Sequence, residues 1–440
     1  MLFLTKTWVY YILNIVKGID KMKLVELEEK EYREFTKKHK AHFLESYEWG
    51  LVSKYRGYKV YYLGLKENEE IKASALVLEK KLLFNYTRIY IPRGFTIDYK
   101  DKELLREMTK EIRKFAKEKK AIVVKIDPAI KLHTIDENAK VVDGENNYDI
   151  VKNLEDVGFI HLPLTKYFET SQPRFTFRIP LENSIEEIEN RYSSTTKSRI
   201  KKAINSEVFV EVGDKDDVKE FSRLMKLTEK RQDFYSHDGE FFEKFYEIFS
   251  KNNMVTLYLG KIDLVKLSEK LEKDRQSYLK ELDEIKDIDS KKANNRRKEI
   301  EKNLHSILEQ ISFLENKPKE TIVVSSYLIV KYNGYAWALY AANDMDYKTM
   351  YANYLVYKTQ IEDAFNENIK VFDVFGTIGD PNSNSSLLGL HDFKKKWGGE
   401  YTEFIGEFDL VLNKLMYFVY TKLIPIYHKL VNRKLKKEVK

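Results

Sequence analysis

An internal repeat constrains the fold of this chain more than any other feature. The order strand, strand, strand, helix, strand runs twice along the sequence, over residues 60–126 and again over residues 255–375. In the second copy Asn333-Gly334 marks a hairpin turn, because both central residues of such a turn need positive φ. We therefore predict two tandem copies of one mixed α/β (α+β) unit. The alternative is a chance similarity between hairpins.

A long insertion separates the first two strands of the second copy. Residues 263–318 stand where the first copy has the short turn 67–70, and they are nearly all helix-forming or charged. Apolar residues recur there at heptad spacing in two runs, which are Leu264, Leu267, Leu271, Tyr278, Leu282 and Ile285, then Ile300, Leu304, Ile307, Ile311 and Leu314. We predict an antiparallel coiled-coil hairpin that replaces a β-turn at little entropic cost. Its basic tip fits an arm that binds nucleic acid or a partner, and it fits a solvated charged coil equally well.

Composition narrows the class of protein. The chain has 440 residues and 43% hydrophobic content, enough for two or three cores, and its net charge of +7 permits an anionic partner without requiring one. The absence of Cys excludes disulfides, thiolate zinc sites and a Cys nucleophile, and it fits a reducing cytosol. His39 and His42 share a face without further ligands, so we expect no metal and no bound cofactor.

Both ends of the chain differ from the two repeats. Residues 1–21 are apolar for about half the length of a membrane span, and we interpret them as an extension or, alternatively, a weak membrane-surface anchor. Residues 413–440 predict a basic amphipathic helix that either rests on an anionic membrane or packs on the domain before it.

Several segments carry side chains suited to binding or catalysis. A polar loop over 377–389 follows the last strand of the second copy and leads to Phe393 and Lys394. The basic helical segment 190–203 suits phosphate or forms an exposed helix face. Arg231 and Tyr235 are four residues apart, so one helix face would present both, and Asp127 ends a buried strand as a base, an amine anchor or a cap.

These motifs, taken in order, resemble the FemABX aminoacyltransferases from about residue 22 to residue 412. The matching positions are Trp49 with Lys54, Arg93-Gly94, Lys125-Ile-Asp127-Pro128, Thr195 with Ile200-Lys-Lys-Ala203, Arg231 with Tyr235, Tyr340-Ala, Tyr351-Ala, Phe375-Gly-Thr-Ile-Gly379 and Phe393-Lys394-Lys395. The helical insertion also sits at the insertion point of that family. Two positions depart from the family pattern, since Phe95 stands where Pro is usual and Ala338 where some members have Tyr.

The resemblance implies an organisation in two acyltransferase-like (GNAT) subdomains. These would be 22–165 and 166–262 with 319–412, joined to the extension 1–21, the arm 263–318 and the terminal helix 413–440. It also implies transfer of an amino acid from aminoacyl-tRNA to the stem peptide of a lipid-linked or UDP-linked peptidoglycan precursor. The expected location is the cytoplasm, including the inner membrane face, with other bridge-forming transferases as further partners.

The same resemblance assigns roles to single residues. Lys54 and Arg231 would hold phosphates or sugar of the precursor, and Arg93 and Tyr351 would also bind substrate. Tyr235, Tyr340, Phe393 and Lys394 would line the reaction site, and Asp127 matches a position considered for the base. An aminoacyl ester is already activated, so the enzyme needs only to position the acceptor amine and stabilise the oxyanion, with Lys394 or a backbone N–H.

Two other functions remain as alternatives. An acyl-CoA acetyltransferase would need a Gly-rich loop before the central helix, and neither residues 343–348 nor 95–100 supply one. A non-catalytic RNA-binding protein would bind tRNA through the arm and the basic segments without any transfer.

Overall fold

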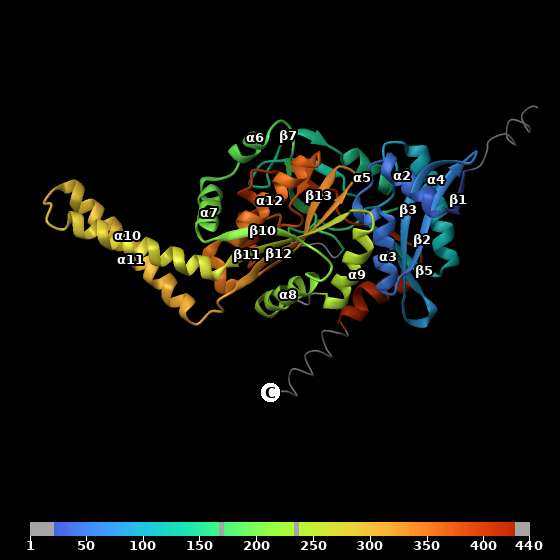
Figure 1. Ribbon diagram of the computed structural model, residues 1–440. Helices are drawn as coiled ribbons and strands as arrows, with labels where there is room; N and C mark the ends of the chain where they lie inside the picture. The colour runs from blue at the N-terminus through green and yellow to red at the C-terminus, as the bar shows by residue number, and fades with distance from the viewer. Residues whose placement is uncertain (1–21, 167–170, 233–236, 427–440) are drawn as a thin grey trace, which may run out of the picture.

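Two β-sheets organise the chain (Figure 1). The computed structural model describes residues 22–166, 171–232 and 237–426, so the predicted extension and the second half of the predicted terminal helix, residues 427–440, lie outside it. The first sheet has the order β1 (Lys23–Glu26), β2 (Lys59–Glu67), β3 (Glu70–Lys81), β4 (Thr87–Ile91), β5 (Ala121–Ile126), β16 (Phe408–Val411) and β8 (Ile160–His161). The second has the order β10 (Val208–Gly213), β11 (Val255–Asp263), β12 (Thr321–Tyr332), β13 (Tyr335–Asn343), β14 (Val371–Asp373), β9 (Phe175–Pro180), β15 (Glu400–Phe404), β6 (Lys131–Ile135) and β7 (Val141–Asn146).

The predicted repeat appears in both sheets. In the first, β2, β3 and β4 pair antiparallel, α4 (Lys102–Glu118) follows, and β5 returns parallel to β4. In the second, β11, β12 and β13 pair antiparallel, α12 (Ala352–Asn366) follows, and β14 returns parallel to β13. The predicted mixed α/β class is therefore confirmed.

Helix α4 illustrates how the sequence specifies these elements. The Asp101 side chain accepts hydrogen bonds from the backbone N–H groups of Glu103 and Leu104 and so caps the helix. Its apolar residues recur every three or four positions and are buried against the sheet, namely Leu105, Met108, Ile112 and Ala116.

The remaining helices cover the sheets or extend from them. They are α2 (Glu29–Lys38), α3 (Tyr47–Tyr55), α5 (Tyr148–Asp156), α6 (Ile185–Asn190), α7 (Ser194–Asn205), α8 (Val218–Gln232), α9 (Gly239–Ser250), α10 (Leu264–Ile285), α11 (Lys291–Glu315), α13 (Leu388–Lys395) and α14 (Lys414–Phe418). Short turns of helix are η1 (Phe43–Glu45), η2 (Leu83–Asn85), η3 (Met345–Met350) and η4 (Val419–Leu423). No helix among the described residues is both long and apolar enough to cross a membrane.

The predicted helical hairpin is observed as α10 and α11, which project from the body of the molecule as a single arm (Figure 1). Both predicted apolar runs contribute side chains that are buried between the two helices or at the base of the arm, among them Leu267, Leu271, Ile300 and Ile307. Arg296 of α11 donates two hydrogen bonds to the Glu281 carboxylate of α10, at 2.6 and 2.8 Å, so charge pairs as well as apolar contacts join the two helices.

The two halves of the chain exchange strands. The late strand β16 inserts between β5 and β8 in the first sheet, while the early strands β6 and β7 extend the second sheet beyond β15. The subdomain boundaries implied by the resemblance divide the chain at residue 165. Each sheet, however, contains strands from both sides of that residue.

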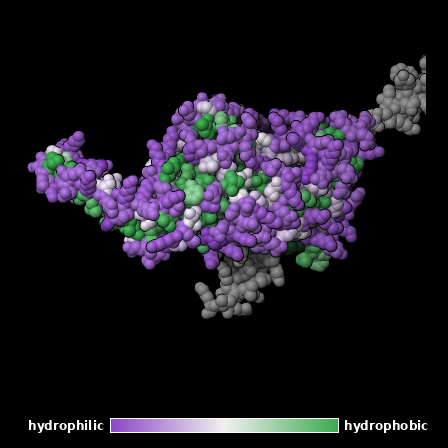
Figure 2. Space-filling view, in the orientation of Figure 1, coloured by the Kyte–Doolittle hydropathy of each residue, from purple (hydrophilic) through white to green (hydrophobic). Residues whose placement is uncertain are grey.

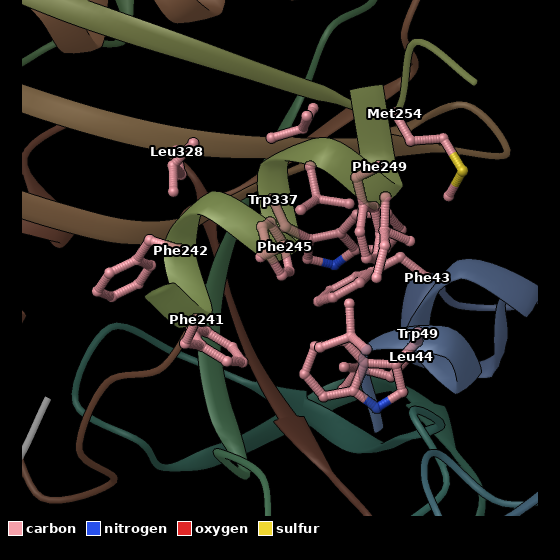
Figure 3. Packing of buried hydrophobic residues seen from close by; sticks show 14 of the residues in the cluster. Phe43, Leu44, Trp49, Phe241, Phe242, Phe245, Phe249, Met254, Leu328 and Trp337 are labelled. Carbon is pink, nitrogen blue, oxygen red and sulfur yellow. The ribbon is translucent and has the colours of Figure 1, made fainter. Parts of the chain in front are cut away.

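One hydrophobic core joins the halves (Figure 3). Phe43 and Trp49 from the first half pack with Phe245, Phe249 and Trp337 from the second, and Figure 3 shows these rings in one cluster. The rings of Phe43 and Trp337 lie 4.9 Å apart between centroids. Aromatic pairs at this spacing stabilise beyond the area they bury, so the halves are held in a fixed relation.

Candidate functional site

A cleft of about 490 Å³ opens between the two halves. Glu45, Arg93 and Asp98 line it from the first half, and Arg178 and Trp337 line it from the second. Two carboxyl groups and two guanidinium groups thus line one space, and the Asp98 carboxylate with the two guanidinium groups suits a ligand that carries both an amine and a carboxylate.

Arg93 is fixed at the floor of this cleft by Asp127. Arg93 and Gly94 both have positive φ, 57° and 85°, and this turn directs the Arg93 backbone N–H to the Asp127 carboxylate at 2.8 Å. The Tyr90 hydroxyl donates to the same carboxylate at 3.0 Å. Burial raises the pKa of Asp127 to about 6, against the lowering effect of Arg93. The two predicted residues therefore lie together, and Asp127 is held by donors on several sides.

Glu45 is a second buried carboxyl group in the cleft. It accepts hydrogen bonds from the Thr96 hydroxyl at 2.7 Å and the His42 backbone N–H at 2.8 Å. Burial raises its pKa to about 8. The sequence analysis missed Glu45, because nothing in its local pattern separates it from a surface glutamate.

Lys394 lies where α13 meets the chain leaving β14. Its side chain is 8% exposed, and its ammonium group donates to the carbonyl oxygens of Phe375 at 2.9 Å and Gly376 at 2.6 Å. Burial lowers the pKa of Lys394 to about 7, and the nearby Asp373 carboxylate opposes this effect. An ammonium group has three N–H donors, so a third remains for a reacting oxygen.

Asp373 links Lys394 to the cleft. Its carboxylate accepts from Arg178 Nε at 3.1 Å, from the Phe375 backbone N–H at 2.8 Å and from the Thr176 hydroxyl. A small cavity of about 10 Å³ is bordered by Arg93 on one side and by Phe375 and Gly376 on the other. The sequence analysis missed Asp373, because a single Asp within the apolar run 371–375 indicates a buried acid but not its partners.

Phe393, next to Lys394, faces a different region. Its ring contacts Tyr354 at 5.1 Å and Tyr357 at 5.2 Å between centroids. Tyr354 lines a second cavity of about 350 Å³ together with Tyr351 and Arg199. Phe393 therefore contacts the lining of the 350 Å³ cavity, whereas Lys394 bonds to two residues that border the 10 Å³ cavity.

The second cavity combines cations with aromatic rings. The Arg199 guanidinium lies 5.2 Å from the Tyr351 ring and donates a hydrogen bond to the Tyr354 hydroxyl. Lys202, one turn further along α7, lies 5.7 Å from the Tyr351 ring. Tyr351 has a φ of 53° and precedes α12, so the N-terminal end of that helix also borders the cavity. Such an arrangement suits a phosphate beside an aromatic base.

Among the remaining predicted residues, the described side chains of Tyr340 and Lys54 line neither the cleft nor the 350 Å³ cavity. Tyr340 contacts Phe242 of α9 at 5.3 Å between ring centroids, and burial raises its pKa to about 12. Lys54 is exposed near the end of α3, Arg231 belongs to the last turn of α8, and Tyr235 lies outside the described residues. The roles assigned to these residues stay predictions. Within the described ranges, no group of three or more His, Asp or Glu side chains is placed to hold a metal.

Comparison with known proteins agrees with this architecture. The model of the FemAB family matches residues 27–424. A lipid II:glycine glycyltransferase of Staphylococcus aureus (strain bovine RF122 / ET3-1) is 28% identical over 434 residues, covering 95% of this chain and 100% of that protein. The protein of the same name from Staphylococcus epidermidis (strain ATCC 35984) is 27% identical over 426 residues, covering 94% and 100%.

A solved structure matches as well. The crystal structure of FemX superposes with a TM-score of 0.71 and 27% identity, covering 90% of this chain and 99% of that one. The aminoacyltransferase expected from the sequence is confirmed by these relatives and by the family match. Because the match extends over nearly the whole chain, this protein belongs to the FemAB family.

Proposed function

We propose that this chain transfers an amino acid from aminoacyl-tRNA to the stem-peptide amine of a peptidoglycan precursor, which builds the interpeptide bridge. The names of its relatives favour lipid II as the precursor and glycine as the amino acid. The observation that carries the proposal is the position of α13. Phe393 contacts the lining of the 350 Å³ cavity. Lys394 bonds to Phe375 and Gly376, which border the 10 Å³ cavity whose other side is formed by Arg93 of the cleft. A transferase with two substrates needs one position at which the reacting groups of both substrates come together.

The cleft between the halves suits the acceptor. A stem peptide presents a free amine and carboxylates, and the cleft offers the Asp98 carboxylate to the former and Arg93 and Arg178 to the latter. Asp373 accepts a hydrogen bond from the Arg178 guanidinium, and Asp127 accepts one from the Arg93 backbone N–H. The first bond orients a recognition group before substrate arrives, and the second fixes the turn that carries the other.

The second cavity suits the 3′ end of the donor RNA. Arg199 and Lys202 can neutralise phosphate, and Tyr351 and Tyr354 offer rings on which unpaired bases stack. Phe393 contacts Tyr354, so an RNA end bound here brings its ester towards Lys394.

The reaction then needs no enzyme nucleophile. The acceptor amine attacks the ester carbonyl, the new C–N bond forms, and the C–O bond to the ribose breaks. The proton lost by the amine goes to the departing ribose oxygen, directly or through water. The third N–H of Lys394 stabilises the oxyanion of the tetrahedral intermediate, and removal of one such donor typically costs about 100- to 1,000-fold in kcat. A donor carried on tRNA places the reaction on the cytoplasmic side of the membrane.

A mass-spectrometric transfer assay tests the proposal. The protein is incubated with total charged tRNA and with either lipid II or the UDP-linked precursor, alongside the Lys394→Met variant. We expect a mass gain of one or more amino-acid residues on lipid II, lost in the variant. Tight tRNA binding without a gain on either precursor would contradict the proposed reaction.

A further inference from the structure

One end of the first sheet exposes apolar side chains on a strained loop. The β3–β4 loop contains η2, where Leu83 and Phe84 are 69% and 81% exposed. Phe84 and Asn85 both have positive φ, 57° and 61°. A bulky residue rarely adopts this left-handed conformation, and such strain is typical of functional segments. The folded chain therefore carries the backbone strain of the left-handed conformation at Phe84. Because the ring is exposed, its contacts within the protein do not offset that strain.

A second exposed apolar set lies at the same end of the sheet. The chain leaving β16 forms α14 and η4, from which four apolar side chains project into solvent, namely Leu415, Phe418, Leu423 and Ile426. Two backbone hydrogen bonds place this helix beside the loop. Thr87, just after the loop, donates to Lys120 at 3.1 Å, and Asn413, just before α14, donates to Ile122 at 3.2 Å. Figure 2 shows a hydrophobic protrusion at this lower edge, where Figure 1 places the β3–β4 loop.

Basic residues surround both apolar sets. They are Lys80, Lys81 and Arg88 around the loop, Lys117, Lys119 and Lys120 at the end of α4, and Lys414 and Lys422 in the terminal helix. Residues 80–88 and 411–426 contain no Asp or Glu, and the end of α4 carries one exposed acid, Glu118, beside its three lysines. The core of a protein–protein interface is depleted of lysine, whereas a bilayer surface accepts apolar side chains at its interface and attracts lysine to anionic headgroups.

We propose that this end of the first sheet, comprising the Leu83–Phe84 loop, the end of α4 and the 414–426 helix, docks on an anionic lipid bilayer. Leu83 and Phe84 enter the headgroup region, while the lysines around them contact the lipid phosphates. The proposal goes beyond the transfer reaction, and its test uses no substrate of that reaction. Failure of one is therefore distinguishable from failure of the other.

Vesicle co-sedimentation of the full chain tests the docking. We expect binding to vesicles of phosphatidylglycerol and phosphatidylcholine and little binding to phosphatidylcholine alone. Leu83→Ser with Phe84→Ser lowers the partition coefficient at least about tenfold, because two apolar side chains no longer enter the interface. The matched control is Val141→Ser with Val142→Ser on β7, an exposed pair in the other sheet, which leaves binding within about twofold.

Two further measurements separate the electrostatic contribution to vesicle binding from the insertion of apolar side chains. Lys414→Glu with Lys422→Glu weakens binding more at low salt than at high salt, since screening already removes part of the attraction at high salt. In a Trp8→Phe background, which removes the tryptophan of the apolar segment 1–21, Phe84→Trp gains fluorescence quenching by brominated lipids that the Trp8→Phe chain with Phe84 lacks. Because the substituted side chains of the loop and of the terminal helix are exposed, these variants keep the melting temperature of the wild type.

Three outcomes overturn the proposal. The first is a wild type that does not bind anionic vesicles, and the second is a Leu83→Ser, Phe84→Ser variant that binds them as well as the wild type. The third is a concentration-dependent dimer that these two substitutions abolish, without vesicle binding. That result makes this end an interface between copies of the chain.

Discussion

The ammonium nitrogen of Lys394 lies 2.9 Å from the carbonyl oxygen of Phe375, a residue whose own backbone is left-handed with φ 58°. Together with the carbonyl of Gly376, this contact fixes the end of a long side chain that would otherwise sample many rotamers. A neutral amine has two N–H groups, which these two carbonyls occupy. Only the ammonium form has a third N–H for an oxyanion.

Replacing Lys394 by Met removes that donor while keeping a long apolar stem in the buried site. We expect kcat for transfer to fall about 100- to 1,000-fold, the usual loss for an oxyanion donor. The KM for both substrates changes little, and circular dichroism stays that of the wild type. Lys395→Met on the same helix serves as the control. An equal decrease of kcat in the two variants would show that Lys394 does not stabilise the oxyanion.

The pH dependence of transfer reports the same group. Burial depresses the pKa of Lys394 to about 7, so the ammonium form is lost as pH rises through neutrality. We expect kcat to fall above about pH 7, and we expect the residual activity of Lys394→Met to lack this descending limb. Steady-state rates between pH 5.5 and 9 with saturating substrates provide the check. A descending limb shared by wild type and variant would assign it to another group.

Arg199 is the cation that stacks on Tyr351 in the second cavity. If a tRNA phosphate binds there, Arg199→Ala raises the KM for charged tRNA about tenfold, equivalent to about 1.4 kcal/mol, and leaves kcat nearly unchanged. The slope of log KM against log salt also falls by about 0.7–0.9 for one lost phosphate contact. Lys201→Ala, exposed on the same helix and outside the cavity lining, is the control and changes KM less than twofold.

Glu45 makes stability depend on pH. Its folded-state pKa is about 8, raised from 4.5. The protonated Glu45 therefore contributes its full stabilisation to the folded state below about pH 4.5, and this stabilisation is lost as pH rises through 8. Gln has the shape of the protonated form and keeps the contacts to His42 and Thr96. Between pH 4.5 and 8, we expect the free energy of unfolding of the wild type to fall by about 1.4 kcal/mol per pH unit relative to that of Glu45→Gln. Urea unfolding at pH 6 and pH 8 measures the difference, and exposed Glu284→Gln is the control.

Phe245 tests whether the shared core makes the two halves one cooperative unit. The ring is completely buried and stacks on Phe249 at 4.5 Å between centroids. Phe245→Ala costs about 3–5 kcal/mol, seen as a lower midpoint of a single transition, because both halves pack on this cluster. Lys251→Ala, just beyond the same helix, changes the stability by less than about 0.5 kcal/mol. Two separate transitions, with only one shifted, would contradict this view.

The sequence predicted those features that depend on local pattern. The repeat, the helical hairpin and its buried residues, such as Ile300 and Ile307, follow from periodicities of two and 3.6 residues. Asp127 and Lys394 were singled out because they follow a strand end and a polar loop, and Arg93 was singled out through the family resemblance. The structure places Arg93 beside Asp127, and the roles of all three stay predictions.

The residues that were missed depend on contacts between distant segments. Asp373 acquires its role from Arg178 and Thr176, and Glu45 acquires its role from Thr96. No spacing within the chain encodes these partners. The exchange of β16 and β6 between sheets was missed for the same reason, since each strand alone fits either sheet.

That exchange has a consequence for how the protein is made. The gap between β5 and β8 is filled by residues 408–411, so the emerging chain carries an open sheet edge until nearly the whole length has left the ribosome. Unpaired edges of this kind template aggregation. Cutting the gene between the two repeats would therefore yield two fragments, each missing strands that only the other can supply.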